Sequence, residues 1–414
     1  MERRVVITGI GAVTPIGIGI DEYFKALKIG KSGIGPITSF DTEGFPSKIA
    51  GEVKNFEPSD YFEPKEAKRM DRYCQFALAS AKMAYKDSGI DLEKINRKKA
   101  GVILGVGMGG LNTYESQMAV YNEKGPRRVT PFLVPMMISN LSAGTIGLEF
   151  GLKGPNYVVT AACASSTHAI GEAFLKIKNN MCDICFTGGS ESTITPLTVA
   201  GFGSMKALST RNEEYNIASS PFDVKRDGFV IAEGGGVLIL EELQHAIDRG
   251  AKIYGEMVGY GLSDDAYHMT QPHPDAEGAT SCIQMAIDMA NIKPEQIDYI
   301  NAHGTSTPFN DRLETKAIKN VFGDYAKKIA ISSTKSMTGH LLGGAGAIEA
   351  IACCMVLNEG IIPPTINYQD VDPECDLNYT PNKFIEKNVN FTLSNSFGFG
   401  GQNSSIIFKK YENK

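Results

Sequence analysis

The chain has 414 residues, of which 42% are hydrophobic and 21% charged, and its formal net charge is −6 at pH 7. Disorder requires low hydrophobicity and high net charge, so this composition excludes a disordered chain. An acidic protein is a poor general binder of nucleic acid, and the length predicts two or three domains or one large intertwined unit.

The N-terminal residues mimic a signal peptide, because Arg3 and Arg4 precede an apolar run. Glycines at positions 9 and 11 break that run and no small-residue cleavage motif follows, so we expect a strand and a turn. The longest stretch without charged residues, 129–148, contains prolines, serines and an asparagine, which favours a buried or interfacial segment over a membrane span. We therefore expect a protein without a membrane partner.

The eight cysteines are sparse for a chain of this length, which favours reduced thiols and a cytoplasmic location. Cys182 and Cys185 form a C-x-x-C pair, but no second pair of metal-ligand spacing accompanies it. The surrounding residues are typical of a buried strand that runs into a glycine turn. A structural role is the interpretation we adopt for this pair.

Strand-like runs alternate with helical segments along the whole chain, which predicts a layered α/β fold. The expected strands are residues 4–8, 101–105, 157–160, 184–187 and 237–240, and then 254–260, 299–302, 329–332, 389–394 and 404–409. Each set is expected to close with a hairpin across a glycine-rich turn, at 228–242 and at 391–410. We interpret the chain as two loosely duplicated halves, 1–250 and 251–414, that pack as one rigid body.

Pro64 is expected to open a helix that runs to about Lys86. Basic residues recur on one face at helical spacing, namely Lys65, Lys68, Arg69 and Arg72. Apolar and small residues fall on the opposite face. On an acidic protein this stripe is either a solvated helix face or a docking surface for an acidic partner.

The glycines at 105, 107 and 110 spell G-x-G-x-x-G after an expected strand, and Glu123 follows about twenty residues later. The match is weak in a chain with 44 glycines. The helix that should begin there also lacks a clear apolar stripe. We therefore do not expect a dinucleotide cofactor.

Cys163 is the first candidate for chemistry. It follows the apolar run NYVVT, and the residues from about Ala164 onward have helical periodicity. This arrangement places the thiol at a strand-to-helix turn, where the helix macrodipole favours a thiolate. The alternative is a small buried cysteine that packs like alanine.

His303 and His340 lie in glycine-flanked turns that follow expected strands, in a chain with only six histidines. Such turns at strand ends are where α/β proteins build their sites. Lys335 lies five residues before His340 and is either a solvated charge or a charge held within the site. The turn at 396–401 is rich in unshielded backbone N–H groups, which suit a developing oxyanion, although an ordinary hairpin turn looks the same.

Four motifs in order resemble one known family. They are TAACASS around Cys163, NAHGTSTPFND around His303, SSTKSMTGHLLGGAGAIEA around Lys335 and His340, and NSFGFGGQN near residue 399. The chain is identified by these motifs as a member of the β-ketoacyl-acyl-carrier-protein synthases, and it is most similar to the elongating type II enzymes of fatty-acid synthesis. The resemblance covers essentially the whole chain.

The resemblance implies an α/β thiolase-like fold, in which two duplicated halves form a five-layered αβαβα sandwich, and a homodimer. It implies a decarboxylative Claisen condensation of acyl and malonyl groups, both delivered by acyl carrier protein. No cofactor is expected, because the phosphopantetheine arm arrives on the carrier. Cys163 would hold the acyl chain, His303 and His340 would bind the malonyl thioester carbonyl, and Lys335 would order the histidine loop.

The resemblance also implies binding residues around this centre. The amides of Cys163 and Phe399 would form an oxyanion hole, with the Phe399 side chain gating the acyl pocket. Substrate binding is assigned to Thr305, Thr307, Met108 and Gly400, and carrier docking to Lys65, Lys68, Arg69, Arg72, Arg127, Arg128 and Lys206. No metal is required, although Asn301, Glu349, Ser394 and Asn395 resemble positions that hold a monovalent cation or water.

Two departures from the family pattern are visible, Gln402 in place of the usual Thr and Met108 in place of a branched aliphatic residue. Neither removes a chemical group. Related alternatives are a type I elongating synthase and a polyketide ketosynthase of the same fold. A non-catalytic chain-length factor is disfavoured because such subunits usually lack the nucleophile, and a cysteine-dependent hydrolase would need no malonyl donor.

Overall fold

A mixed β-sheet forms the frame of the protein in the computed structural model, which describes residues 3–412. Within this range eleven strands join one sheet. The strands of the first half are β1 (Val5–Thr14), β2 (Gly17–Ile18), β5 (Ala100–Gly105), β6 (Asn156–Val159), β7 (Ile184–Glu191) and β8 (Gly234–Glu242). Those of the second half are β9 (Gly255–Asp264), β10 (Tyr299–Asn301), β11 (Ala330–Ser332), β14 (Phe391–Phe397) and β15 (Gln402–Lys409).

The two halves of the sheet repeat one topology. The strand order is β6-β5-β7-β8-β1 in the first half and β11-β10-β14-β15-β9 in the second. In each half the first three strands run parallel and the last two pair antiparallel. The halves join where β1 pairs with β9. This repeat confirms the predicted duplicated fold, while the exact division after residue 250 stays a prediction.

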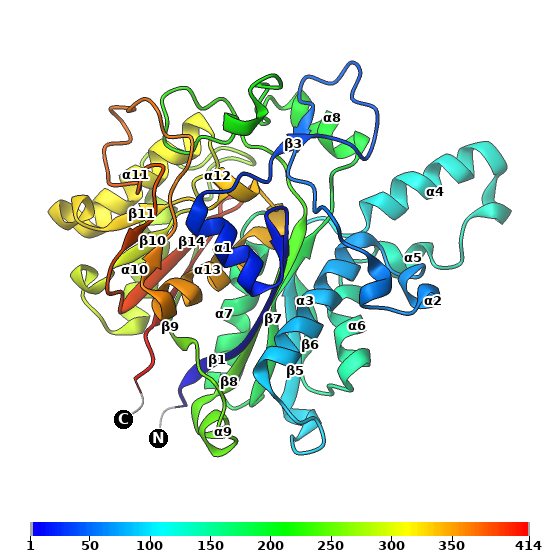
Figure 1. Ribbon diagram of the computed structural model, residues 1–414, viewed down its shortest axis with the longest axis horizontal. Helices are drawn as coiled ribbons and strands as arrows, with labels where there is room; N and C mark the ends of the chain where they lie inside the picture. Colours follow the sequence, from blue (N-terminus) through cyan, green and yellow to red (C-terminus); the bar gives the residue numbers. More distant parts are fainter. Residues whose placement is uncertain (1–2, 413–414) are drawn as a thin grey trace.

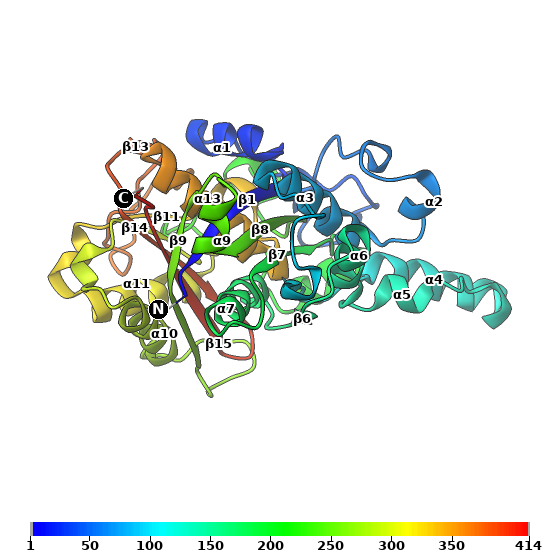
Figure 2. The ribbon, with the colours of Figure 1, turned by 90° about the horizontal axis from the view of Figure 1, so that it is seen from below.

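Helices separate and cover the two halves of the sheet, which gives five layers (Figures 1 and 2). The outer helices of the first half are α3 (Arg72–Ser88) and α6 (Leu141–Phe150), and those of the second half are α10 (Glu277–Ala290) and α11 (Pro308–Phe322). Between the halves lie α7 (Ser165–Lys178) and α13 (Ala345–Glu359), which contact each other and strands of both halves. The middle layer is therefore made by one helix from each half.

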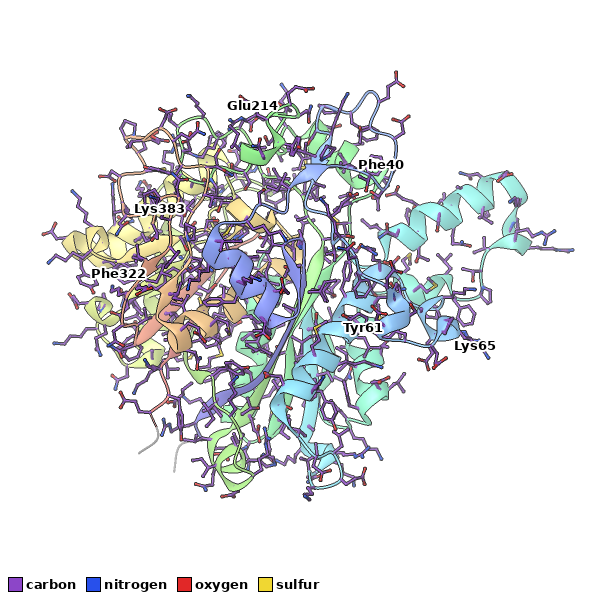
Figure 3. The ribbon with its side chains drawn as sticks, viewed as in Figure 1. Phe40, Tyr61, Lys65, Glu214, Phe322 and Lys383 are labelled. Carbon is purple, nitrogen blue, oxygen red and sulfur yellow. The ribbon has the colours of Figure 1, made fainter. Side chains whose placement is uncertain are left out.

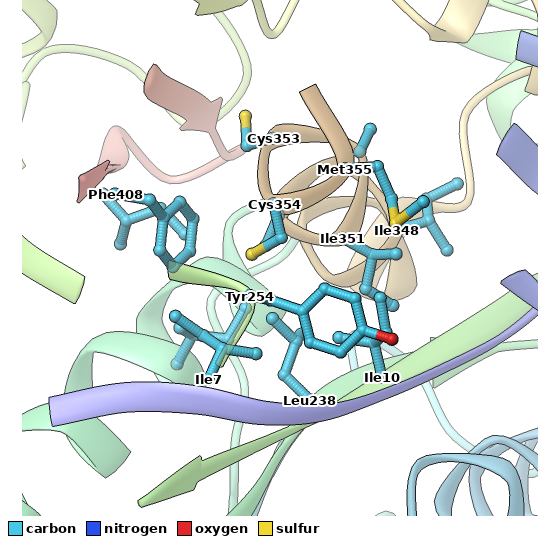
Figure 4. Packing of buried hydrophobic residues seen from close by; sticks show 14 of the residues in the cluster. Ile7, Ile10, Leu238, Tyr254, Ile348, Ile351, Cys353, Cys354, Met355 and Phe408 are labelled. Carbon is cyan, nitrogen blue, oxygen red and sulfur yellow. The ribbon is translucent and has the colours of Figure 1, made fainter. Parts of the chain in front are cut away.

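The main hydrophobic cluster of the core is built around α13. In Figure 4 the helix residues Ile348 and Ile351 lie opposite Ile7, Ile10 and Leu238 of the sheet. The segment from 342 to 359 is long and apolar enough to cross a membrane, but 89% of it is buried inside the protein. Its hydrophobicity therefore serves the packing between the two halves of the sheet.

The remaining elements are short, except α4, which projects from the body together with α5 (Figure 1). The helices are α1 (Ile20–Ile29), α2 (Pro64–Ala67), α4 (Leu111–Lys124), α5 (Leu133–Met137), α8 (Pro196–Ser204), α9 (Leu243–Asp248) and α12 (Lys335–Thr338). The single turns of 3₁₀ helix are η1 (Pro58–Asp60), η2 (Arg97–Lys99), η3 (Pro126–Arg128), η4 (Tyr215–Ile217), η5 (Pro294–Gln296), η6 (Gly323–Lys327) and η7 (Leu342–Gly344). Two-residue strands are β3 (Gly35–Pro36), β4 (Ile49–Ala50), β12 (Ile361–Ile362) and β13 (Ile385–Glu386).

The first strand is twice as long as expected, because its glycines do not end it. β1 continues through Gly9 and Gly11 to Thr14. A Cβ on Gly9 would lie 2.4 Å from the carbonyl oxygen of Ala84, and one on Gly11 would lie 2.2 Å from that of Ser80. These glycines let α3 lie directly on the strand, so the prediction that the strand ends before Gly9 was wrong. The predicted turn follows later, at residues 15–16 between β1 and β2.

The expected helix from residue 64 to 86 is two helices, α2 and α3. The chain leaves helical geometry before Asp71, whose side chain accepts a hydrogen bond from the Tyr73 amide and caps α3. Aspartate is a strong N-cap because it satisfies an amide that has no partner within the helix. Arg72 therefore starts a new helix and does not continue the basic stripe of α2.

Only the second of the two expected hairpins exists. β14 and β15 pair across the glycine turn as predicted. In residues 228–242, however, β8 begins only at Gly234. The preceding backbone pairs with the segment around His340, since Val230 accepts from the His340 amide and the Ala232 amide donates to the His340 carbonyl. This pairing holds a candidate site residue instead of closing a hairpin.

Candidate active site

A cavity of about 690 Å³ lies at the junction of the two halves. Its lining unites most of the residues singled out in the sequence, namely Cys163, His303, His340, Thr305, Thr307, Phe399, Met108 and Lys206. The volume falls in the usual range for small-molecule sites. Segments separated by up to about 290 residues of sequence meet there, which is why no local pattern could establish their proximity.

Cys163 lies on a sharp turn between β6 and α7. Ala162 adopts a left-handed conformation with φ of 47°. The Ser165 hydroxyl accepts a hydrogen bond from the Ala161 amide at 2.9 Å and donates to the Ala162 carbonyl at 2.7 Å. The turn is thus stabilised on both sides, and the thiol projects into the cavity in the manner of a nucleophile elbow.

Two imidazoles share the cavity floor with this thiol. The sulfur of Cys163 and one ring nitrogen each of His303 and His340 all lie within 4.8 Å of one another. The imidazole rings are edge to face, with centroids 5.4 Å apart. A nucleophile and two hydrogen-bonding groups therefore surround a single point, which is the arrangement needed to attack a carbonyl group and hold its oxygen.

His303 is held in one orientation by two neighbours. Its Nδ1 lies 3.4 Å from Nζ of Lys335, and its backbone amide donates to Glu314 at 2.8 Å. Burial lowers the pKa of His303 well below its usual value, and the charge of Lys335 lowers it further. The ring is neutral at pH 7. Because the Lys335 ammonium can only donate, Nδ1 beside it is assigned as the acceptor, and the ring proton is assigned to Nε2.

His340 differs from His303 in its hydrogen bonds and not in the direction of its pKa shift. Burial and the charge of Lys335 lower its pKa well below the usual value. Neither ring nitrogen has a hydrogen-bond partner among the described residues, although both are buried. Its ring packs edge to face on Phe229 at 5.3 Å between centroids. A buried imidazole without a partner is costly, which indicates that its partner is the substrate.

Lys335 and Glu349 form a buried ion pair beneath the histidines, with side-chain exposures of 2% and 1%. The Lys335 ammonium also donates to the carbonyl of His303 at 2.7 Å. Burial raises the pKa of Glu349, while Lys335 lowers it. The predicted alternative of a solvated Lys335 is therefore excluded, and its charge acts within the site.

The thiol of Cys163 is not a resting thiolate, contrary to our expectation from the helix dipole. Burial raises its pKa to about 12, against the lowering effect of Lys335 and of a hydrogen bond from the Phe399 backbone. Desolvation of the charged form exceeds the benefit of the helix N-terminus. Attack by the sulfur must therefore be coupled to loss of its proton.

The comparison with protein families assigns both halves of the chain to one family. Residues 2–246 match the beta-ketoacyl synthase N-terminal domain, and residues 254–369 match the beta-ketoacyl synthase C-terminal domain. The chain belongs to the β-ketoacyl synthase family. The resemblance drawn from four sequence motifs is thereby confirmed.

Relatives of this synthase match over almost their whole length. Proteins named 3-oxoacyl-[acyl-carrier-protein] synthase 2 from Synechocystis sp. and Coxiella burnetii are 51% and 46% identical, with 99% of both chains covered in each case. A solved beta-ketoacyl synthase from Burkholderia phymatum is 35% identical with a TM-score of 0.92. A polyketide ketosynthase in complex with its acyl-carrier protein is 36% identical with the same TM-score, and both structures cover 100% of each chain.

The turn that follows β14 brings the Phe399 backbone to the sulfur of Cys163. Gly400, predicted to bind substrate, lies in this turn and is exposed. Its amide donates to the Met269 carbonyl at 2.8 Å. Gln402 begins β15 beside this turn and is exposed. Thr305 and Thr307 line the cavity nearby, and their hydroxyls lie 2.9 Å apart.

The glycine motif at 105–110 holds a protein carboxylate. The amides of Gly107, Met108 and Gly109 donate to Glu191 at 2.8, 3.2 and 3.1 Å. Burial raises the pKa of Glu191 to about 7, although these hydrogen bonds lower it. The donors that would cradle a pyrophosphate are therefore already engaged.

The predicted docking residues do not form one stripe. Lys65 projects into solvent from α2 (Figure 3) and Lys68 is exposed too. Arg69 lies over the Phe132 ring at 4.7 Å. Arg72 is half-buried and pairs with Glu233 at 2.8 Å, so its charge is engaged within the protein, and its assignment to docking stays a prediction. Arg127 and Arg128 are exposed in η3, beyond the outer end of α4, and Lys206 is exposed at the cavity rim.

The predicted cation position has a partial set of free ligands. Both side-chain polar atoms of Asn301, one oxygen of Glu349 and the hydroxyl of Ser394 are buried without a partner among residues 3–412. Asn395, by contrast, donates to Glu314 and accepts from Ser405. The first three residues fit a bound water or monovalent cation.

Sequence reasoning missed two carboxylates that position the site, Glu314 and Glu191. Glu314 accepts from the amides of His303 and Gly304, both at 2.8 Å. A signal existed, since Asp311 and Glu314 are acidic residues with helical spacing just after the histidine motif. Glu191 ends a strand, and no local feature distinguishes it from an exposed acid.

The charge of Lys335 should accelerate modification of Cys163. We expect Lys335→Met to slow alkylation by iodoacetamide by up to about tenfold near pH 8, since each unit of pKa is a factor of ten in thiolate. The rate is measured by mass spectrometry of the Cys163 peptide.

Two further variants make this test specific. Lys335→Met/Glu349→Gln should slow alkylation as well, without leaving a buried unpaired carboxylate. Lys225→Met, which removes an exposed lysine paired with Asp370, is the matched control. An unchanged rate in both Lys335 variants would contradict the assigned electrostatic role.

Proposed function

We propose that this synthase elongates fatty acids by condensing acyl-[acyl-carrier-protein] with malonyl-[acyl-carrier-protein] to give 3-oxoacyl-[acyl-carrier-protein], CO₂ and free carrier protein. The observation that carries the proposal is one thiol and two neutral imidazoles within 4.8 Å in a single cavity. Cys163 argues against a non-catalytic subunit, because such a subunit needs no nucleophile. Relatives named for this reaction are 46–51% identical to the chain.

The first step is acyl transfer to Cys163. Its sulfur attacks the thioester carbonyl, the carbon–sulfur bond to the carrier breaks, and the thiol proton ends on the departing carrier thiol. The backbone amides of Cys163 and Phe399 are assigned to the transient oxyanion, which the hydrogen bond from Phe399 to the sulfur supports. Lys335 promotes the step by favouring negative charge on sulfur.

The second step is decarboxylation of the malonyl group. Its thioester oxygen takes the place between His303 and His340, where it accepts from the Nε2–H of His303 and from one ring N–H of His340. Neutral imidazoles serve as donors without offering a charged acid that would protonate the enolate. Loss of CO₂ leaves a carbanion whose negative charge on oxygen is stabilised by these two hydrogen bonds.

The third step forms the new carbon–carbon bond. The carbanion attacks the acyl carbon on Cys163, the bond from that carbon to sulfur breaks, and the Cys163 thiolate takes a proton from water. No cofactor is needed in this sequence, since the phosphopantetheine arm is part of the substrate. Thr305 and Thr307 line the cavity where hydroxyl groups suit the amides of that arm.

Substitution of the three central residues should separate these steps. We expect Cys163→Ala to abolish acyl transfer and condensation, and His303→Ala or His340→Ala to keep some acylation but lose decarboxylation by about 10²–10³-fold. Acyl adducts, CO₂ release and the two-carbon-longer product are measured by mass spectrometry. An acyl adduct on another cysteine, such as Cys182, would refute the assignment.

Docking of the carrier protein is proposed on Lys65, Lys68, Arg69 and Lys206, with Arg127 and Arg128 as further candidates. All six are exposed cations on an acidic protein. Carrier-bound substrates must bring their arm to the cavity rim, where Lys206 lies. Electrostatic complementarity of this kind raises the association rate with an acidic partner.

Charge reversal at Lys65→Glu/Arg69→Glu should raise KM for carrier-bound substrate and weaken its salt dependence. Turnover of small pantetheine thioesters should keep its wild-type value, because these side chains lie outside the cavity. Lys328→Glu/Lys383→Glu changes the charge equally at exposed positions elsewhere and is the matched control. Equal losses on carrier-bound and small substrates would mean that the α2 region is only structural.

A homodimer is proposed through the edge formed by β6 and the projecting α4 and α5. β6 ends the sheet, so one side of its backbone is free to pair with a second copy. Apolar side chains stand exposed on the projection, including Tyr114, Met118, Tyr121, Val134 and Ile138. Such a patch is costly in water unless it is covered.

Met118→Glu/Tyr121→Glu is expected to weaken this association. The double variant should sediment as a monomer at protein concentrations where the wild type sediments as a dimer. Met285→Glu, on an exposed methionine of α10, is the control and should leave the dimer intact. A monomeric wild type at micromolar concentration would overturn the dimer proposal.

The acyl chain is proposed to extend from Cys163 toward Met108, since one cavity is lined by both residues. Met108 is unbranched and 41% exposed, so it can move aside for a long chain more easily than a branched residue.

A cytoplasmic location is proposed because all eight cysteines are free thiols, as expected in a reducing compartment. A bound monovalent cation or water near Asn301 remains part of the proposal.

A further inference from the structure

Glu191 gathers backbone donors from two loops that are far apart in the sequence. It ends β7 with 0% exposure. Its carboxylate accepts from three successive amides at Gly107, Met108 and Gly109 and from the amide of Gly343. Four donors to one carboxylate is a full set for two oxygen atoms.

The Glu191 carboxylate leaves no room for a side chain at the neighbouring glycines. A Cβ on Gly107 or on Gly343 would lie 2.7 or 2.6 Å from Glu191 Oε2. A Cβ on Gly343 would also lie 2.2 Å from the Gly107 nitrogen. The two loops therefore meet backbone to backbone at the carboxylate, and Glu191 is the group that joins them.

Both loops carry parts of the acyl site. Met108 lines the cavity, and Gly343 follows His340 by three residues. The carbonyl of Gly343 also accepts a hydrogen bond from the Ser166 hydroxyl on α7, the helix that follows Cys163. The Glu191 carboxylate thus sets the distance between the Met108 loop and the Gly343 loop, and the Gly343 loop is in turn bound to the helix that follows Cys163.

We propose that Glu191 is a positioning residue that determines how deep the acyl pocket is. It fixes the backbone of Met108, so that only the Met108 side chain can yield to a growing chain. A short primer does not reach this loop, whereas a long primer packs against it. The inference rests on the proposed path of the acyl chain from Cys163 to Met108.

Glu191→Gln tests this role with almost no change in volume. The amide has one acceptor oxygen, and its NH₂ group faces backbone N–H donors that it does not satisfy. Part of the 107–109 loop therefore loses its anchor while the rest of the cavity keeps its residues. Substrates that contact Met108 should be affected more than those that do not.

The measurement is kcat/KM for primers from about four to about fourteen carbons, each added CH₂ contributing further apolar contact in a fixed pocket. We expect Glu191→Gln to reduce the ratio of long-primer to short-primer kcat/KM by about tenfold, the loss expected for hydrogen bonds to a charged group. Glu241→Gln is the matched control, because Glu241 is an equally buried carboxylate in β8 that binds Thr8 and Arg249 away from the cavity. Its ratio should stay within about twofold of the wild type.

A second reference distinguishes the possible failures. Met108→Phe should block long primers if the chain follows the proposed path. If it does so and Glu191→Gln leaves the ratio within about twofold of wild type, the role of Glu191 is refuted. If Met108→Phe leaves the primer profile unaltered, the proposed path of the acyl chain is refuted, and the inference about Glu191 that rests on it is refuted too. Equal losses for all primers with a matching fall in melting temperature would mean that Glu191 is only structural.

Discussion

The buried ion pair of Lys335 and Glu349 is the interaction on which the site depends. Two charges withdrawn from water are costly, and they persist only where further hydrogen bonds satisfy them. Here the ammonium also binds the His303 carbonyl and approaches the His303 ring. Burial keeps both imidazoles neutral and the charge of Lys335 adds to this effect, while the same charge partly counters the effect of burial on the Cys163 thiol. One positive charge therefore acts on the pKa of three groups, and burial is the larger cause of the shift in each.

That arrangement requires burial from solvent, which the duplicated fold supplies. Placing α7 and α13 between two copies of one sheet topology buries both helices and brings their N-terminal ends to the same cavity. Glu314 and Glu191 then fix the loops through backbone amides. Because these carboxylates bind backbone amides, the loops that carry His303 and Met108 are held in place by the protein itself.

Several features of the chain could be predicted because they are local. The alternation of strands and helices, the strand-to-helix turn at Cys163 and the small-residue turns at His303 and His340 all follow from sequence pattern. The errors were local as well. Gly9 and Gly11 were interpreted as ending a strand, but the close approach of α3 excludes side chains there. Arg72 continued a basic periodicity, but it binds Glu233, 161 residues away.

The sequence by itself determined the family and the order of the motifs and indicated the candidate reacting groups, since these depend on residue types at short spacing. Only the tertiary structure decided their protonation states and positions. A pKa depends on burial and on charges brought from distant segments, so a helix N-terminus alone suggested a thiolate where burial maintains a thiol. The partners of Glu191 likewise lie about 80 residues before it and about 150 after it, and only the folded sheet brings them together.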